Sequence, residues 1–220
     1  MMKNIILPIL LLFAVYACDN GGDYLTDGGL SNPNVGTTTL EFFRSHEQLD
    51  TLAILIERAG MEDLVNGETT IFAPNNLSIK HYIDKVLSEL RQSDPLAEYT
   101  VNDIPVDTLT KYLGGYIFNG KITRDNMTPD QGKIYTATNG EERRISLEPT
   151  NQYGNELESY PEYVYFTYKN GSEWDDWDRT INDPDEKDDK FVVRTSNLQS
   201  TNGMIYVLQG GHTLFNYKSN

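Results

Sequence analysis

The chain has a single cysteine, Cys18, and only three histidines among its 220 residues. One cysteine excludes an intrachain disulfide framework and any zinc site built on several cysteines. Positive charge is also scarce, because 18 Lys and Arg residues face 33 Asp and Glu residues and leave a formal net charge of −15. Nucleic acid and anionic lipid headgroups repel a protein this acidic, so we expect no nucleic-acid partner.

The sequence also lacks the motifs that mark common kinds of catalysis. It contains no Gly-x-Ser-x-Gly elbow for a nucleophilic serine and no glycine-rich loop for phosphate groups. His46 and Glu47 start a zinc-protease motif, but Asp50 occupies the position of its second histidine. We therefore expect a protein that is not an enzyme and that uses no cofactor and no metal.

The amino-terminal residues have the pattern of an export signal. Lys3 precedes an apolar run over residues 5–15, which is too short to cross a bilayer. Residues 15–18, with Ala17 immediately before Cys18, resemble the lipobox of bacterial lipoproteins, in which the cysteine carries acyl chains. This resemblance implies a signal peptide over residues 1–17, lipid attachment at Cys18 and a place in the bacterial cell envelope, at the surface or periplasmic face of the outer membrane. Buried methylenes contribute roughly 0.8 kcal/mol each, so acyl chains would anchor the protein without a spanning helix.

The remaining sequence predicts a tether followed by one α+β domain. Residues 18–39 are rich in Gly, Asn, Asp and Thr, a composition typical of a flexible segment. Residues 40–220 place apolar residues at helical spacing first and in short strand-like runs later. The helices are expected near residues 45–59, 75–91 and 105–113, and the strands near residues 69–73, 116–118, 133–137, 143–147, 163–168, 191–194 and 204–208. The polar stretch at about 148–190 is interpreted as an insertion in this domain.

Two segments resemble the signatures of fasciclin domains, and residues 116–123 are similar to the stretch between them. The first signature is a strand that runs into an Asn-capped helix, and the second is the strand that closes the fold. The matching positions are Thr70, Phe72, Ala73, Pro74 and Asn75 in the first signature and Asn202 and Gly203 in the second. The resemblance implies helices packed against a twisted β-sandwich or wedge. Packing and capping explain these seven positions, so we assign them structural roles.

The resemblance also implies adhesion or other binding without catalysis. Tyr116 and Tyr206 stand where the family has histidines, and no Arg-Gly-Asp is present, so the integrin-type activity of animal members is not carried over. We expect a non-catalytic adhesion or binding lipoprotein of the cell envelope, with a surface protein or a glycan as its ligand.

An acidic, aromatic segment inside the expected insertion suggests a more specific alternative. It holds both tryptophans of the chain, and its candidate ligand contacts are Trp174, Asp175, Asp176, Trp177 and Asp178. Aromatic faces stack on sugar rings and carboxylates accept hydrogen bonds from hydroxyl groups, which favours a carbohydrate-binding accessory lipoprotein of an outer-membrane glycan uptake system. Packing of both tryptophans against the domain is a second interpretation. Calcium binding by the carboxylates at residues 183–189 is a third, although the EF-hand order is missing.

Overall fold

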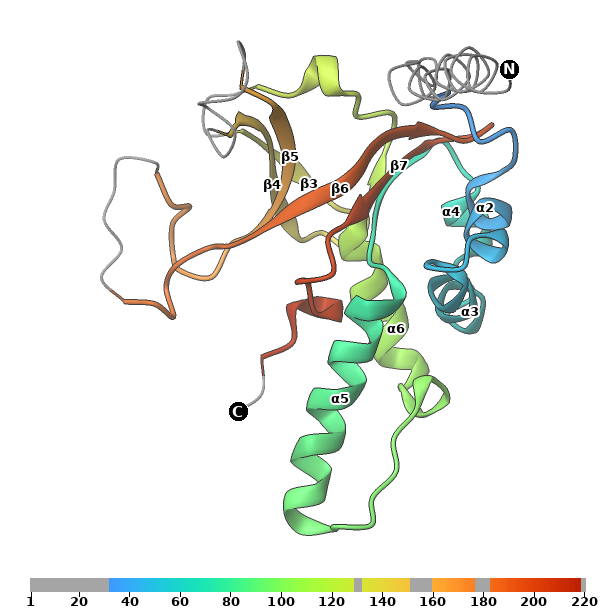
Figure 1. Cartoon of the computed structure of the whole chain (residues 1–220), viewed down its shortest axis with the longest axis vertical. Helices are drawn as coiled ribbons and strands as arrows, with labels where there is room; N and C mark the ends of the chain where they lie inside the picture. The colour runs from blue at the N-terminus through green and yellow to red at the C-terminus, as the bar shows by residue number, and fades with distance from the viewer. Residues whose placement is uncertain (1–31, 129–131, 151–159, 177–182, 219–220) are drawn as a thin grey trace, which may run out of the picture. The chain divides into compact units, whose positions relative to one another are not determined.

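The structure is a computed structural model that describes residues 32–128, 132–150, 160–176 and 183–218. One compact unit begins at Pro33 and includes all of the helices and strands described below. Helices come mainly from its first half and strands mainly from its second half, as the colours in Figure 1 show. This confirms the α+β class.

In the described residues, five α-helices precede most of the strands. They are α2 (Thr39–Ser45), α3 (Asp50–Arg58), α4 (Glu62–Val65), α5 (Asn76–Ser93) and α6 (Val106–Tyr112). The side chain of Thr38 caps α2 by accepting a hydrogen bond from the Glu41 N–H. The helix expected near residues 45–59 begins later, at Asp50, because Ser45 ends α2 and donates a hydrogen bond back to the Phe42 carbonyl. Gly60 follows α3 with φ +65°, a conformation that ends a helix and favours glycine.

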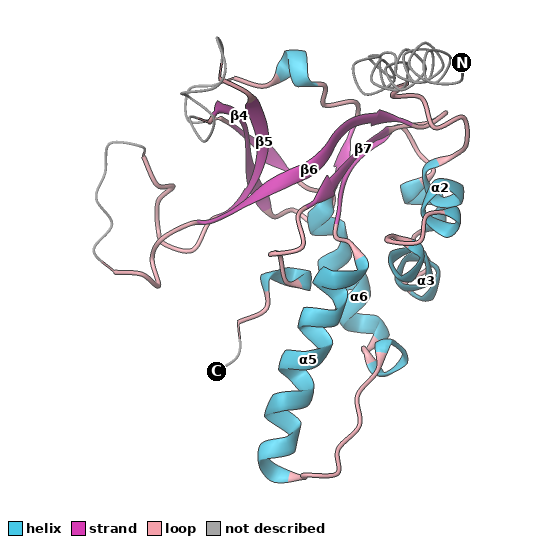
Figure 2. Cartoon of the chain, viewed as in Figure 1, coloured by secondary structure: helices cyan, strands magenta, loops and turns pink. Residues whose placement is uncertain are grey.

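Seven strands form one sheet in the order β2-β1-β7-β6-β5-β4-β3. Their bounds are β1 (Thr69–Ala73), β2 (Ile117–Asn119), β3 (Lys133–Thr136), β4 (Glu142–Pro149), β5 (Glu162–Tyr168), β6 (Asp189–Gln199) and β7 (Met204–Leu208). Among the strand pairs of the described residues, β1–β7 is parallel and the others are antiparallel. Thr138, just after β3, donates its N–H to the Ile117 carbonyl in β2 at 2.8 Å, so the two edges of the sheet approach each other. The sheet is therefore a nearly closed wedge, and α2, α3, α5 and α6 lie nearer to β7 than to β4 (Figure 2).

The core holds the first signature against the closing strand. Phe72 in β1 stacks on Tyr206 in β7 with ring centroids 4.8 Å apart and on Phe166 in β5 at 4.9 Å. All three side chains are fully buried, as are Ala73 and Pro74 beside them. Burial of each large apolar side chain contributes about 2 kcal/mol to stability. Because the rings come from β1, β5 and β7, this aromatic stack joins the helical and strand-rich halves of the chain.

Hydrogen bonds fix the two ends of the first signature. The Thr70 hydroxyl donates to the Gly120 carbonyl and accepts from the Ile122 N–H, both at 2.8 Å. Asn75 is the N-cap of α5, where its side-chain oxygen accepts from the Ser78 N–H at 2.9 Å. The turn after β2 and the start of α5 are thereby joined to the same strand.

Asn202 and Gly203 connect the closing strand to the first helices. The Asn202 side chain accepts from the Thr39 N–H at 2.9 Å and donates to the Gly67 carbonyl at 3.0 Å. A Cβ at Gly203 would lie 2.3 Å from the Thr69 carbonyl oxygen, a distance that no side chain tolerates. Glycine is required here by close approach of two backbones, not by an unusual φ.

Two expected boundaries differ from the structure. Residues 33–39 are part of the domain rather than of a tether, because Pro33 and Val35 are hydrogen-bonded to Gln199 in β6 and Thr39 is buried in α2. The stretch at 148–190 is not a separate insertion, because it contains β5, which pairs with β4 on one side and β6 on the other. A strand is expected near residues 163–168, and β5 confirms it; the expectation of an insertion is wrong, because β5 lies inside the sheet.

Candidate functional site

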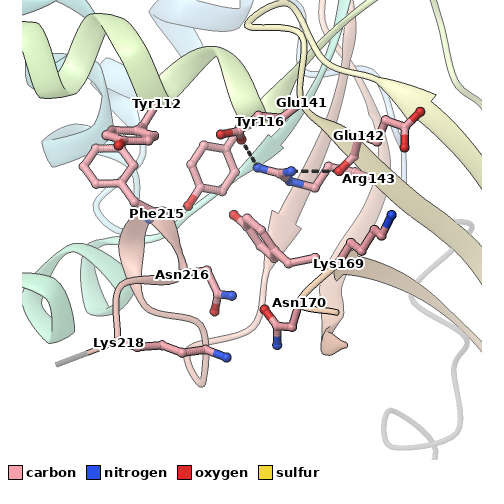
Figure 3. A pocket seen from close by; sticks show the side chains of 11 residues that line it. Tyr112, Tyr116, Glu141, Glu142, Arg143, Lys169, Asn170, Phe215, Asn216 and Lys218 are labelled. Carbon is pink, nitrogen blue, oxygen red and sulfur yellow. Dashed lines mark hydrogen bonds and ion pairs between the residues drawn. The ribbon is translucent and has the colours of Figure 1, made fainter. Parts of the chain in front are cut away.

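A cavity of about 490 Å³ opens where the carboxyl-terminal segment passes the ends of β4, β5 and α6. Figure 3 shows Tyr112 and Phe215 close together on one side, the Arg143 guanidinium at the centre, and Asn170 and Asn216 below. Volumes of about 300–1,000 Å³ are usual for small-molecule sites. The cavity therefore has the size of a ligand site and a lining that is both aromatic and polar.

An ion pair between the buried Arg143 and the partly exposed Glu141 forms the central wall of the cavity. Arg143, 7% exposed, pairs with the Glu141 carboxylate and donates to the Glu142 carbonyl at 2.8 Å. Its guanidinium lies 4.1 Å from the centroid of the Tyr168 ring, a cation–π contact. A Cβ at Gly115 would lie 2.9 Å from both the Arg143 Nη2 and the Glu141 Oε2. Glycine at position 115 therefore makes room for the pair.

His212 lies beneath this wall and is fully buried. Its Nε2 is 3.2 Å from the Tyr116 hydroxyl and 3.3 Å from the Tyr168 hydroxyl. Burial, reinforced by the charge of Arg143 and by His81, lowers the pKa of His212 to about 3, so the imidazole is neutral near pH 7. Burial also raises the pKa of both tyrosines well above the usual value, which keeps their hydroxyl groups protonated.

The carboxyl-terminal rim has an unusual backbone. Phe215 and Asn216 both have left-handed backbone angles, with φ values of 63° and 51°. An aromatic residue rarely adopts this conformation, which costs about 1–3 kcal/mol. The Phe215 N–H donates to the Tyr116 hydroxyl at 2.7 Å, and the Phe215 ring lies 5.6 Å from the Tyr112 ring. The surrounding contacts thus hold the strained Phe215–Asn216 turn in place, and this turn points the Phe215 ring toward the cavity.

Asp189, the first residue of β6, fastens the opposite rim. Its Oδ2 accepts from Asn216 at 2.7 Å, from Asn170 at 2.8 Å and from Lys218 at 2.8 Å. Burial alone would raise the pKa of Asp189, but the bonds from Lys218, Asn216 and Asn170 outweigh it and lower the pKa below the usual value. The carboxylate therefore joins three segments around the cavity.

The tryptophan-containing segment lies at a different place, on the outer face of the sheet. Trp174 is half-buried, with the Arg144 guanidinium 4.9 Å from its ring centroid. Asp175 and Asp188 each accept a hydrogen bond from the other's N–H, at 2.8 and 2.9 Å. Asp176 is exposed. One face of Trp174 therefore contacts Arg144, and Asp175 and Asp188 bond to each other's backbone.

Three of the expected site residues, Cys18, Trp177 and Asp178, lie outside the described residues. Within the described part of the chain, no group of three His, Cys, Asp or Glu side chains is arranged to hold a metal ion, and the carboxylates at 183–189 are not gathered into such a group. No helix in this part is both long and apolar enough to cross a membrane.

Sequence reasoning did not select the residues of the cavity. One signal in the sequence could have found Arg143. It lies two residues before Ile145 in β4, so both side chains are on the same, buried face of the strand. A charged residue on the inward face of a strand needs a partner. His212 and Phe215 follow the last strand and show no comparable pattern, because distant segments of the chain determine their surroundings.

Comparisons with known proteins gave one kind of match. No protein-family model and no curated protein matches the chain. Among solved structures, the chain is similar to a fasciclin (FAS1) domain pair from the insect cell adhesion molecule fasciclin I, with a TM-score of 0.45 and 15% sequence identity. The match covers 78% of this chain and 49% of that one, so the chain spans about half the length of the structure it matches. Fasciclin is the family that residues 70–75 and 202–208 resemble.

Proposed function

We propose that this chain is a non-catalytic binding domain of the cell envelope, held at a membrane by acyl chains on Cys18. Its cavity would take a ligand on a neighbouring protein or glycan. The two ends of β6 support this proposal, because they lie far apart. At one end the incoming chain is attached, and at the other end is the cavity.

The hydrogen bonds of β6 define both ends. Gln199, the last residue, donates its N–H to the Pro33 carbonyl at 2.8 Å and accepts from the Val35 N–H at 2.9 Å. Asp189, the first residue, holds the cavity residues Asn170 and Asn216. The strand has 11 residues, which corresponds to on the order of 30 Å at about 3.3 Å per residue. The segment that enters the domain and the cavity therefore lie at opposite ends of one strand, which leaves the cavity clear of that segment.

The protonation states in the cavity support binding rather than turnover. A general base must reach the proton that it removes, but His212 is fully buried. The two tyrosines beside it have pKa values raised by burial, so they supply no phenolate near neutral pH. Within the described residues lining the cavity, the remaining ionisable groups are the Arg143–Glu141 pair and side chains at the surface.

The anchor is tested by labelling bacteria with an alkyne fatty acid during expression of the full chain. Because the chain has one cysteine, Cys18→Ser is a clean control for lipid attachment. We expect label on the wild-type protein and its recovery with membranes, and an unlabelled Cys18→Ser protein that is not retained. Equal label on both proteins, or none on the wild type, would contradict the anchor.

The binding role is tested with the full chain carrying Cys18→Ser, applied to protein and glycan arrays. We expect retention on at least one class of ligand and loss of retention when Phe215 is replaced by Leu. Retention on neither class would contradict a binding function.

A further inference from the structure

The aromatic residues of the cavity give it an apolar face of limited size. Tyr112 and Phe215 are both half-buried, and their rings lie 5.6 Å apart at a tilt of 42°. Half-buried rings leave part of their surface for a ligand, and such a surface favours the apolar side of a ring-shaped molecule. The cavity is thus suited to a compact cyclic ligand.

Charges in and around the cavity balance one another. Arg143 is paired with Glu141, and Lys218 is paired with Asp189 at 2.8 Å. The exposed Lys169 and Glu142 add one charge of each sign to the lining. A ligand carboxylate would have to compete with Glu141 for the buried guanidinium, and a ligand cation would have to compete with Arg143 for the carboxylate. The balance therefore favours an uncharged ligand.

The same groups supply many hydrogen-bonding partners for an uncharged ligand. Of the five N–H donors of Arg143, two bond to Glu141 and Glu142 and the one at Nε is buried, which leaves one N–H on each terminal nitrogen for a ligand. Glu141 adds an acceptor beside these donors, with 40% of its side chain exposed. A pair of neighbouring hydroxyl groups, which both donate and accept, matches this arrangement.

The cavity is also held in place before any ligand arrives. The strained Phe215–Asn216 turn is fixed by Tyr116 and Asp189, and Gly115 leaves room for the ion pair. Backbone strain maintained by several contacts is typical of functional sites. A site held in this way loses little conformational entropy when it binds.

We infer that this cavity, rather than the segment around Trp174, binds an uncharged pyranose unit of a glycan. The sugar ring lies against Phe215 and Tyr112, and neighbouring hydroxyl groups bond to Arg143 and Glu141. This inference rests on the proposed function and names the ligand class of its binding site.

The test measures the affinity of the full Cys18→Ser chain for methyl glycosides of glucose, galactose and mannose by titration calorimetry, with methyl glucuronide as the charged probe. Phe215→Leu keeps an apolar side chain but removes the flat face, and Glu141→Gln removes the acceptor charge. We expect each variant to bind at least one neutral glycoside about tenfold more weakly. The matched controls, Phe42→Leu at a half-buried phenylalanine and Glu98→Gln at an exposed glutamate, should bind like the parent protein.

Thermal unfolding of each variant separates a damaged site from a damaged fold, and Trp174→Ala separates the two candidate sites. Loss of sugar binding in Trp174→Ala but not in Phe215→Leu would overturn the assignment of the cavity. Binding of glucuronide alone would overturn the uncharged ligand. Retention on a protein array without binding of any glycoside would overturn the inference and leave the proposed binding function standing. No binding in either experiment would overturn both.

Discussion

The buried histidine beneath the cavity predicts how stability depends on pH. His212 is fully buried, and burial lowers its pKa from the ordinary 6.5 to about 3. In the unfolded chain the imidazole is exposed and takes up a proton with its ordinary pKa. Between these two pKa values the unfolded state binds more protons than the folded state, so stability falls as the pH falls.

The size of the effect follows from the two pKa values of His212. Each pH unit well inside the window between them changes the free energy of unfolding by about 1.4 kcal/mol. The unfolded imidazole is mostly neutral at pH 7 and mostly protonated at pH 5, so the loss between these values is about 2 kcal/mol. The carboxylate of Asp189, whose pKa lies below 3.8, contributes a loss at lower pH, outside this interval.

The assay is urea unfolding at pH 7, 6 and 5, followed by circular dichroism. The wild-type protein should lose about 2 kcal/mol between pH 7 and pH 5, and His212→Gln, which does not titrate, should lose much less. His46→Gln retains His212 and should therefore behave like the wild type. Equal pH dependence of the wild type and His212→Gln would refute a neutral, buried His212.

Three further substitutions test the fold and the cavity. Gly203→Ala places a methyl group against the Thr69 carbonyl at 2.3 Å and should cost about 3 kcal/mol, or prevent folding, as measured by urea unfolding and expression of soluble protein. Asn75→Ala removes the cap of α5 and a bond to the Leu208 carbonyl and should cost about 1–2 kcal/mol in the same assay, whereas an unchanged midpoint would argue against the cap. Gly115→Ala crowds the ion pair of the cavity, so it should strongly reduce ligand retention on the arrays and only slightly lower the melting temperature. Full retention would show that the pair is not part of the site.

The sequence predicted some elements well because local patterns determine them. Strands β1 and β7 are short runs rich in β-branched, aromatic and aliphatic residues that are buried throughout, and their observed bounds equal the expected ones. The start of α5 follows from the capping preference of Asn75. The expected span of β6 was too short, because register shifts and the left-handed Asn197 interrupt the alternation along its second half.

The cavity could not be predicted in the same way because its residues come from distant segments. Tyr116, Arg143, Tyr168 and His212 meet through contacts that span up to 96 residues, as between the Tyr116 hydroxyl and His212. Each residue taken alone has an ordinary packing explanation. Only the sheet order, which brings β4 and β5 beside the segment after β7, gathers them around one cavity.

Ligand binding at the cavity end of β6 is open to a single comparison. The most direct measurement compares the full Cys18→Ser chain with its Phe215→Leu variant on combined protein and glycan arrays, after both have been shown to unfold at the same temperature. We expect the parent protein to be retained by at least one ligand and the variant to lose most of this retention. Equal retention of the two proteins on every ligand would contradict it.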